Sequence, residues 1–179
     1  QLGADPTIDP QVESITARTT IEVLTVDQAF TDALLRTYAG SAPYTEVVLA
    51  NTEEELLPAA LVFELVTPDM PVGIQQFATN VRYLQFGSNV PQLMVSVVDP
   101  TSVTGTLLAN ELDLITAMSP LYGMMEAGIF TDTMIGGTDA RVLISNGRET
   151  LTYGIVNGEV LVVASSPDTF AEIHSLLTN

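Results

Sequence analysis

Cysteine, lysine and tryptophan are all absent from this 179-residue chain, and histidine occurs only once. Without cysteine the chain can form no disulfide scaffold, thiol nucleophile or thiolate metal site. A zinc centre is disfavoured as well, because a single histidine is the only preferred zinc ligand left. Without lysine the chain contains neither a Ser-x-x-Lys motif nor a P-loop, and it has no Gly-x-Ser-x-Gly elbow. These absences point away from an enzyme.

Positive charge is also scarce. Twenty-two acidic residues stand against five basic ones, all of them arginine, which gives a net charge of −17. Such a charge repels phosphate backbones and anionic lipid headgroups, so binding to nucleic acid or to a membrane surface is disfavoured. The longest apolar runs, such as 56–66, are shorter than the roughly 20 residues that span a bilayer. We therefore expect no nucleic-acid partner and no membrane insertion by this segment.

Residues 1–18 contain two Asp-Pro pairs and no hydrophobic periodicity, and we interpret them as a linker or an extended arm. The chain begins at Gln1 without a basic or apolar leader, as expected of a trimmed start or of a terminus left after removal of a signal or anchor. We predict an extracytoplasmic protein, either of the cell envelope or secreted, whose anchor would lie in an upstream segment.

A β-branched run, a helix cap and an apolar helical stripe follow one another four times along the chain. The four strands are predicted at 20–24, 46–50, 93–98 and 160–164, and the caps at Thr25, Thr52, Asp99 and Ser166. Pro58 is expected to kink the second helix or to shift its start. The third helix is predicted to run from Pro100 to about Ser119. Another strand is predicted over 81–86.

The second half of the chain contains a predicted antiparallel meander over 140–165. Asn-Gly pairs at 146–147 and 157–158 separate alternating apolar runs, and this dipeptide favours the type I′ turns of hairpins. We therefore predict an α+β fold with the helices packed on one face of the sheet. Residues 19–179 are expected to form one domain. The alternative is two similar half-domains, with lobes 19–66 and 80–179 joined by 67–79.

The segment 121–139 is long for a connection and unusually apolar. We predict an irregular flap that either covers one end of the sheet or presents an adaptable interaction patch. The candidate interaction residues in it are Tyr122, Met124, Met125, Ile129, Phe130, Met134 and Ile135.

Carboxylates are the remaining candidates for chemistry. Calcium candidates are Asp5/Asp9/Glu13, Glu53/Glu54/Glu55 and Asp132/Asp139, but none has the spacing of an EF-hand loop. Paired carboxylates could serve a glycosidase, although the aromatic platforms usual for sugar rings are scarce. His174 lies at the edge of the last apolar stripe, where a packed or solvent-edge histidine is favoured over a catalytic base. We therefore predict no catalytic, cofactor-binding or metal-binding residue, and no cofactor.

Two stretches, 82–114 and 130–177, resemble a group of envelope proteins from small-genome candidate-phylum bacteria. Those proteins have an N-terminal membrane anchor, a proline-rich spacer and a domain of this kind. The resemblance implies an anchored ectodomain, although such proteins often carry lysine and arginine where this chain carries aspartate and threonine. The features that carry it are Phe86-Gly87 before a strand, the long helix after Asp99, the strand start at 139–143 and the helix start at 166–170.

These observations predict a non-enzymatic structural or protein-interaction ectodomain of a cell envelope or surface assembly. Two alternatives stay open. One is a carboxylate-based hydrolase or carbohydrate-active enzyme, and the other is a calcium-dependent adhesion or S-layer-like module that would explain the acidity.

Overall fold

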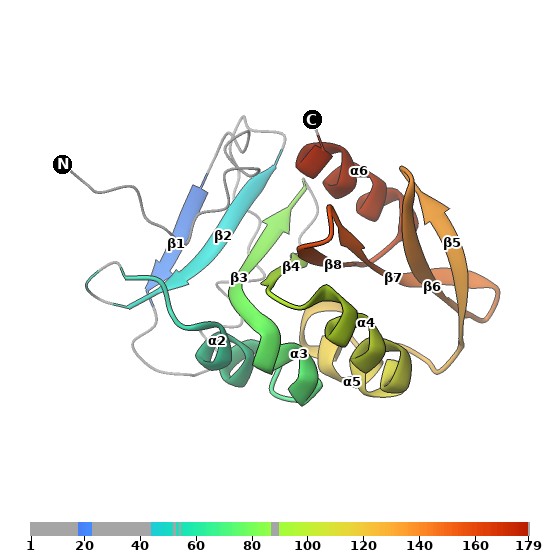
Figure 1. The fold of residues 1–179 in the computed structure, drawn as a ribbon, viewed down its shortest axis with the longest axis horizontal. Helices are drawn as coiled ribbons and strands as arrows, with labels where there is room; N and C mark the ends of the chain where they lie inside the picture. The colour runs from blue at the N-terminus through green and yellow to red at the C-terminus, as the bar shows by residue number, and fades with distance from the viewer. Residues whose placement is uncertain (1–17, 23–43, 52, 54, 87–89, 179) are drawn as a thin grey trace.

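The computed structural model describes residues 18–22, 44–51, 53, 55–86 and 90–178, with side chains from residue 44 onward. Within these ranges the strands form a single sheet with the order β1-β2-β3-β4-β8-β7-β6-β5 (Figure 1). The elements are β1 (Arg18–Glu22), β2 (Thr45–Ala50), α2 (Ala59–Val66), α3 (Val72–Phe77), β3 (Ala78–Gln85), β4 (Gln92–Val97), α4 (Pro100–Ala109), α5 (Glu111–Tyr122), β5 (Ile129–Ile135), β6 (Thr138–Ser145), β7 (Arg148–Val156), β8 (Val160–Ala164) and α6 (Pro167–Thr178).

The predicted α+β class and the meander are confirmed. Strands β6, β7 and β8 follow one another through the two Asn-Gly turns. Both residues of each turn have the positive φ of a type I′ turn, 51° and 72° at Asn146-Gly147 and 54° and 74° at Asn157-Gly158. Apart from the parallel pair β1–β2, all pairings in the described sheet are antiparallel.

Helices cover both faces of the sheet, so the expectation that they pack on one face is wrong. Leu161 and Val163 of β8 join the core beneath α2 to α5, whereas Val160 and Val162 face Phe170 and its neighbours on α6. In Figure 1, α6 lies on the opposite side of the sheet from α4 and α5. The continuous apolar run of β8 already fits a strand buried on both faces, because a half-exposed strand alternates apolar and polar residues.

Two of the predicted caps are present. The Asp99 carboxylate accepts a hydrogen bond from the Ser102 amide at 3.0 Å, and Pro100 occupies the first turn of α4. That bond from Ser102 lowers the pKa of Asp99. At the start of α6, the Ser166 hydroxyl accepts a bond from the Thr169 amide at 3.2 Å.

The long helix expected after Asp99 is in fact two helices. The break falls at Asn110, whose side-chain amide donates to the Thr106 carbonyl at 2.7 Å and so competes with a continuing helix. Farther upstream, α2 begins at Ala59, directly after Pro58, so the proline shifts the start of that helix. Asn51 caps the turn before it, with its side-chain oxygen accepting from the amides of Glu53 and Glu55. Thr52 and the first predicted helix, 25–40, lie outside the described residues.

The segment 121–139 is also more regular than an irregular flap. Helix α5 continues to Tyr122, Gly123 turns the chain at φ 78°, and residues 129–135 form strand β5. A two-residue turn at Gly136-Gly137 then leads into β6, with Ile135 paired to Thr138. The flap is therefore largely the outermost hairpin of the sheet.

Candidate functional site

Strand β5 ends the sheet, and within the described ranges it pairs only with β6 (Figure 1). Its seven residues, IFTDTMI, are rich in the β-branched types that favour strands. Asp132 is the one charged residue among them. An edge strand presents unpaired backbone N–H and C=O groups, and natural edges are commonly blocked by lysine, proline or bulges. No proline or lysine lies in β5, and its register with β6 is unbroken.

The turn at Gly136-Gly137 determines which backbone groups of β5 face outward. Both glycines have positive φ, 60° and 88°, as in a type I′ turn, so the flanking pair Ile135–Thr138 is hydrogen-bonded across the hairpin. Hydrogen-bonded and non-hydrogen-bonded pairs alternate along an antiparallel ladder. The inward groups thus belong to Ile135 and every second residue before it, while the outward groups belong to Met134, Asp132 and Phe130.

The seven predicted interaction residues divide into two sets. Tyr122, Met125, Phe130 and Ile135 pack against the protein's own cores. Met124, Ile129 and Met134 are exposed, at 99%, 74% and 65%. These three do not form one patch, because Met124 lies in the loop before β5, and Ile129 and Met134 lie on opposite faces of that strand. Ile129 and Met134 have in common that both lie on the edge strand of the described sheet.

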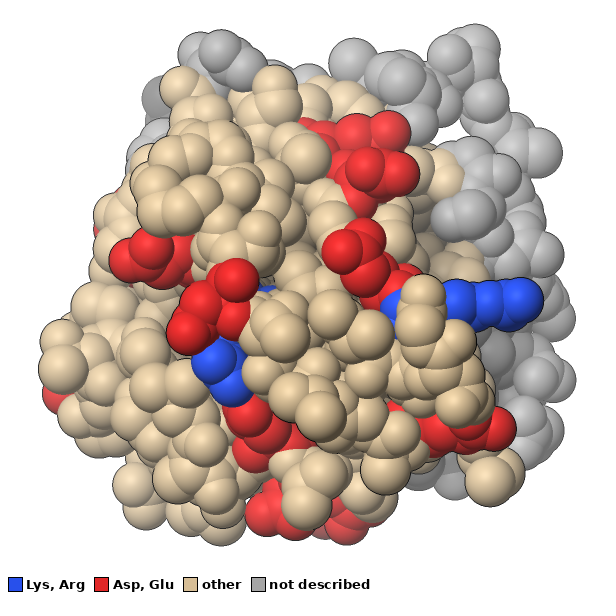
Figure 2. Space-filling model, turned by 90° about the vertical axis from the view of Figure 1, so that its right-hand side faces the viewer, with Lys and Arg blue, Asp and Glu red and all other residues tan. Residues whose placement is uncertain are grey.

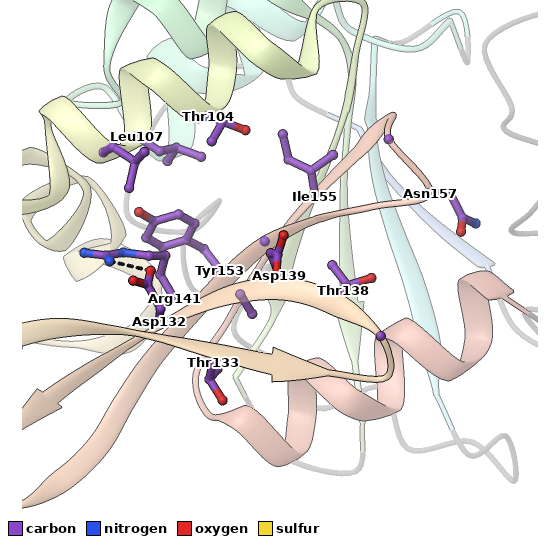
Figure 3. A pocket seen from close by; sticks show the side chains of 15 residues that line it. Thr104, Leu107, Asp132, Thr133, Thr138, Asp139, Arg141, Tyr153, Ile155 and Asn157 are labelled. Carbon is purple, nitrogen blue, oxygen red and sulfur yellow. Dashed lines mark hydrogen bonds and ion pairs between the residues drawn. The ribbon is translucent and has the colours of Figure 1, made fainter.

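A groove of about 740 Å³ runs beside this edge, between α4 and the outer hairpins. Figure 3 shows Tyr153, Ile155 and Arg141 projecting from the sheet toward Leu107 and Thr104 of α4. Asp132 and Asp139 also line the groove. Helices α4 and α5 cover the middle of this sheet face, so its outer part is left open.

A charged network forms one end of the groove. The Arg141 guanidinium donates from Nε to Glu111 and from Nη1 to Asp132, each at 2.7 Å. The hydroxyl of Tyr153 donates to the same Glu111 oxygen at 2.8 Å. Burial raises the pKa of Tyr153, and the Glu111 carboxylate raises it further. Hydrogen bonding to Glu111 is the main cause of the raised pKa of Arg141. Arg141 and Tyr153 therefore both keep their protons at neutral pH.

The two carboxylates of this network differ in exposure. The Glu111 side chain is 19% exposed, whereas that of Asp132 is 87% exposed. With one guanidinium between two carboxylates, the three groups carry a net charge of −1. Figure 2, which views the molecule from the β5 side, shows acidic groups at several places over this surface and few basic ones. The edge is therefore exposed, partly apolar and electronegative.

This network was missed in the sequence analysis, although part of it could have been predicted. Counting back from the Gly136-Gly137 turn pairs residue 132 with 141, so the pair Asp132–Arg141 follows from the hairpin register alone. Counting back from Asn146-Gly147 would pair Arg141 with Thr152, and an irregularity between Leu143 and Ile144 shifts the register so that Tyr153 is its partner instead. The contribution of Glu111 could not be predicted in this way, because it depends on where α5 packs.

The other candidates from the sequence lie apart from this site. His174 packs against the outer hairpin, with its Nε2 atom 3.1 Å from the Thr138 hydroxyl. Asp132 is engaged by Arg141, Glu53 is exposed, and Asp5, Asp9, Glu13 and Glu54 lie outside the described residues. Within the described ranges, no three His, Asp or Glu side chains gather closely enough to hold a metal ion. None of the described helices is both long and apolar enough to cross a membrane.

A second ion pair is buried in the other half of the sheet. Arg82 of β3 lies 3.5 Å from Glu46 of β2, and both side chains are 1% exposed. Arg82 also donates to the Ser96 hydroxyl of β4 at 3.3 Å. A buried pair of this kind ties neighbouring strands together and offers no surface to a ligand.

No family model matches this chain, and neither a curated protein nor a solved structure similar to it was found.

Proposed function

We propose that this chain is a non-enzymatic protein-interaction module, an ectodomain of a cell envelope or surface assembly, that binds an extended segment of a partner protein along β5. The observation that carries this proposal is the outer edge of β5, seven residues long, which pairs with no other described strand and carries no proline, lysine or bulge. A strand added there would bond to the outward backbone groups of Asp132 and Met134, with its side chains meeting the exposed Ile129 and Met134.

Strand addition is supported by the surface that β5 offers, which has few exposed apolar side chains, namely Ile129 and Met134, beside a row of outward backbone groups. Strand addition draws affinity from main-chain hydrogen bonds, so it needs little apolar area, and β5 offers little. The net charge of −17 supports a protein partner over nucleic acid or anionic lipid, because both of the latter would be repelled. The resemblance of 82–114 and 130–177 to anchored envelope proteins supports the proposed location.

Neither alternative function is favoured by a specific contact. A carboxylate-based hydrolase would need a carboxylic acid free to donate a proton to a substrate, but the Glu111 carboxylate already accepts hydrogen bonds from Arg141 and Tyr153. A calcium module would need clustered free carboxylates, and the groove carboxylate Asp132 is bonded to Arg141.

The proposal can be tested with a display library of random heptapeptides, selected for binding to the folded chain. Selected peptides should lose binding to a Met134→Lys variant, because a lysine on the edge strand disfavours the addition of another strand. Met124→Lys is the matched control. It makes the same substitution at an exposed methionine in the neighbouring loop, changes the net charge equally, and should keep binding.

Amide hydrogen exchange locates the peptide-binding site on the protein. Bound peptide should slow exchange at the amides of Asp132 and Met134, which face outward, and should leave those of Thr131 and Thr133 little changed. If no peptide is enriched, or if enriched peptides bind Met134→Lys as tightly as wild type, strand addition at β5 is wrong.

A further inference from the structure

We infer that the partner segment is a basic strand that runs antiparallel to β5 and places one arginine or lysine opposite Asp132. This inference rests on the proposed function and specifies its ligand. It follows from three observations on β5, namely its register, the charge at its centre and the two faces on which its side chains lie.

The register excludes a second copy of the chain as the natural occupant. If two β5 strands paired antiparallel over all seven residues, Asp132 would lie directly opposite Asp132 of the other copy. Like charges directly opposite one another destabilise a strand pair. Each chain would also bring a net charge of −17, so the long-range repulsion acts in the same direction. The central aspartate therefore selects against self-association and in favour of a cationic strand.

The charge of the groups around Asp132 also favours a cationic partner strand. Asp132 has one described ion-pair partner, Arg141, and that guanidinium is shared with Glu111. The excess negative charge of this group is left on its most exposed member, Asp132. A cation opposite Asp132 on an added strand would lie within cross-strand reach of its carboxylate, since directly opposed Cβ atoms are about 5 Å apart. Asp139, paired with Met134 one strand farther in, adds a second negative charge on the same face.

The alternation of β5 sets the remaining positions. Phe130, Asp132 and Met134 share the groove face, while Ile129, Thr131, Thr133 and Ile135 share the face that carries α6. We number the positions of an antiparallel partner strand from the residue opposite Ile135. Its second position then lies opposite exposed Met134, its fourth opposite Asp132 and its seventh opposite exposed Ile129. The inferred pattern is therefore an apolar residue, then a basic residue two positions later, then an apolar residue three positions after that.

Two peptides of identical composition test this pattern. Thr-Leu-Thr-Arg-Thr-Ser-Val places its arginine opposite Asp132, and Thr-Leu-Arg-Thr-Thr-Ser-Val moves the arginine to the other face. Binding of each is measured by NMR titration of isotope-labelled protein at low and high salt. The first peptide should bind about threefold more tightly than the second, as expected of one cross-strand ion pair, and the difference should shrink at high salt.

Two variants assign the effect to a residue. Asp132→Asn should make the two peptides bind equally, whereas the matched Asp139→Asn variant should keep most of the difference. Equal binding of both peptides to wild type, with exchange protection on β5, would refute the basic-strand pattern and leave the proposed function standing. Binding of neither peptide would refute the pattern but not strand addition itself, which the library selection and the Met134→Lys variant test. A wild-type dimer in sedimentation that Met134→Lys dissociates would identify a second copy as the occupant and overturn the inference.

Discussion

Strands β8 and β5 differ in almost every respect except their backbone conformation. All five residues of β8 are 0% exposed, it is paired on both edges, and helices cover both of its faces. Among the strands that the structure describes, β5 is paired on one edge only, and its Ile129 and Met134 are mostly exposed. Both are rich in β-branched residues, but β8 is apolar throughout, whereas β5 has the polar residues Thr131, Asp132 and Thr133 at its centre. The comparison teaches that position in the sheet, together with this difference in polarity, decides whether a strand is enclosed in the core or lies at an exposed edge.

The largest expected effect compares one truncation at the centre with one at the edge. Leu161→Ala should lower the free energy of unfolding by about 2–5 kcal/mol, because it removes a fully buried side chain and leaves a cavity. Ile129→Ala should change it by about 0.5 kcal/mol or less, as an exposed substitution does. Chemical denaturation measures both. Similar losses in the two variants would remove the distinction between centre and edge.

The next largest effect on the free energy of unfolding is expected at the turn that joins β7 to β8. Gly158 has φ 74°, a conformation that a β-branched residue adopts only with strain, so Gly158→Val should cost more than about 1 kcal/mol. Gly105→Val is the control, because an added Cβ would meet open space at either position but Gly105 lies in helix α4. Equal melting temperatures for Gly158→Val and wild type would argue against the type I′ turn.

Two tyrosines next to the central strands should respond in opposite directions to loss of the hydroxyl. Tyr122 donates to the Val163 carbonyl at 2.7 Å, so Tyr122→Phe should cost about 1 kcal/mol. The Tyr83 hydroxyl is buried and has no hydrogen-bond partner among the described residues, so Tyr83→Phe should be neutral or stabilising. Thermal melts of both variants would reveal the difference, and a larger loss for Tyr83→Phe would contradict it.

The same tyrosines predict a loss of stability in alkali. Burial raises the pKa of both Tyr83 and Tyr122, so each holds its proton in the folded state above the pH at which it ionises in the unfolded chain. Their contribution is complete below an unfolded pKa of about 10 and is lost as the pH rises above it, at about 1.4 kcal/mol per pH unit for each group. Tyr122→Phe should reduce this slope, as followed by denaturation between neutral and alkaline pH.

The smallest effect is expected at the contact between α6 and the outer hairpin. His174→Gln keeps a group able to bond to Thr138, so the free energy of unfolding should change by about 0.5 kcal/mol or less. Peptide binding at β5 should be unchanged. A variant that folds normally but no longer binds would show that His174 belongs to the binding site.

Local signals in the sequence predicted much of the fold. Asn146-Gly147, Asn157-Gly158 and the Asp99 cap each act through a few adjacent residues, and each formed as expected. The errors concerned packing. Helix placement on both faces, and the contact of Glu111 with Arg141, depend on how distant segments meet. The exposed Met134 and the buried Phe130 have similar hydrophobicity and lie on the same face of β5, so only their positions along the strand separate them.

The central place of β8 has a consequence for how the chain is made. Strand β4 completes its pairing only when residues 160–164 arrive, because β8 is its neighbour on that side. During synthesis one edge of β4 therefore stays unpaired until these residues have left the ribosome. Contacts between segments so far apart in sequence form slowly, and an apolar strand with an unpaired edge is prone to aggregate. The folding of this protein is thus expected to finish late, and to depend on keeping β4 from other partners until then.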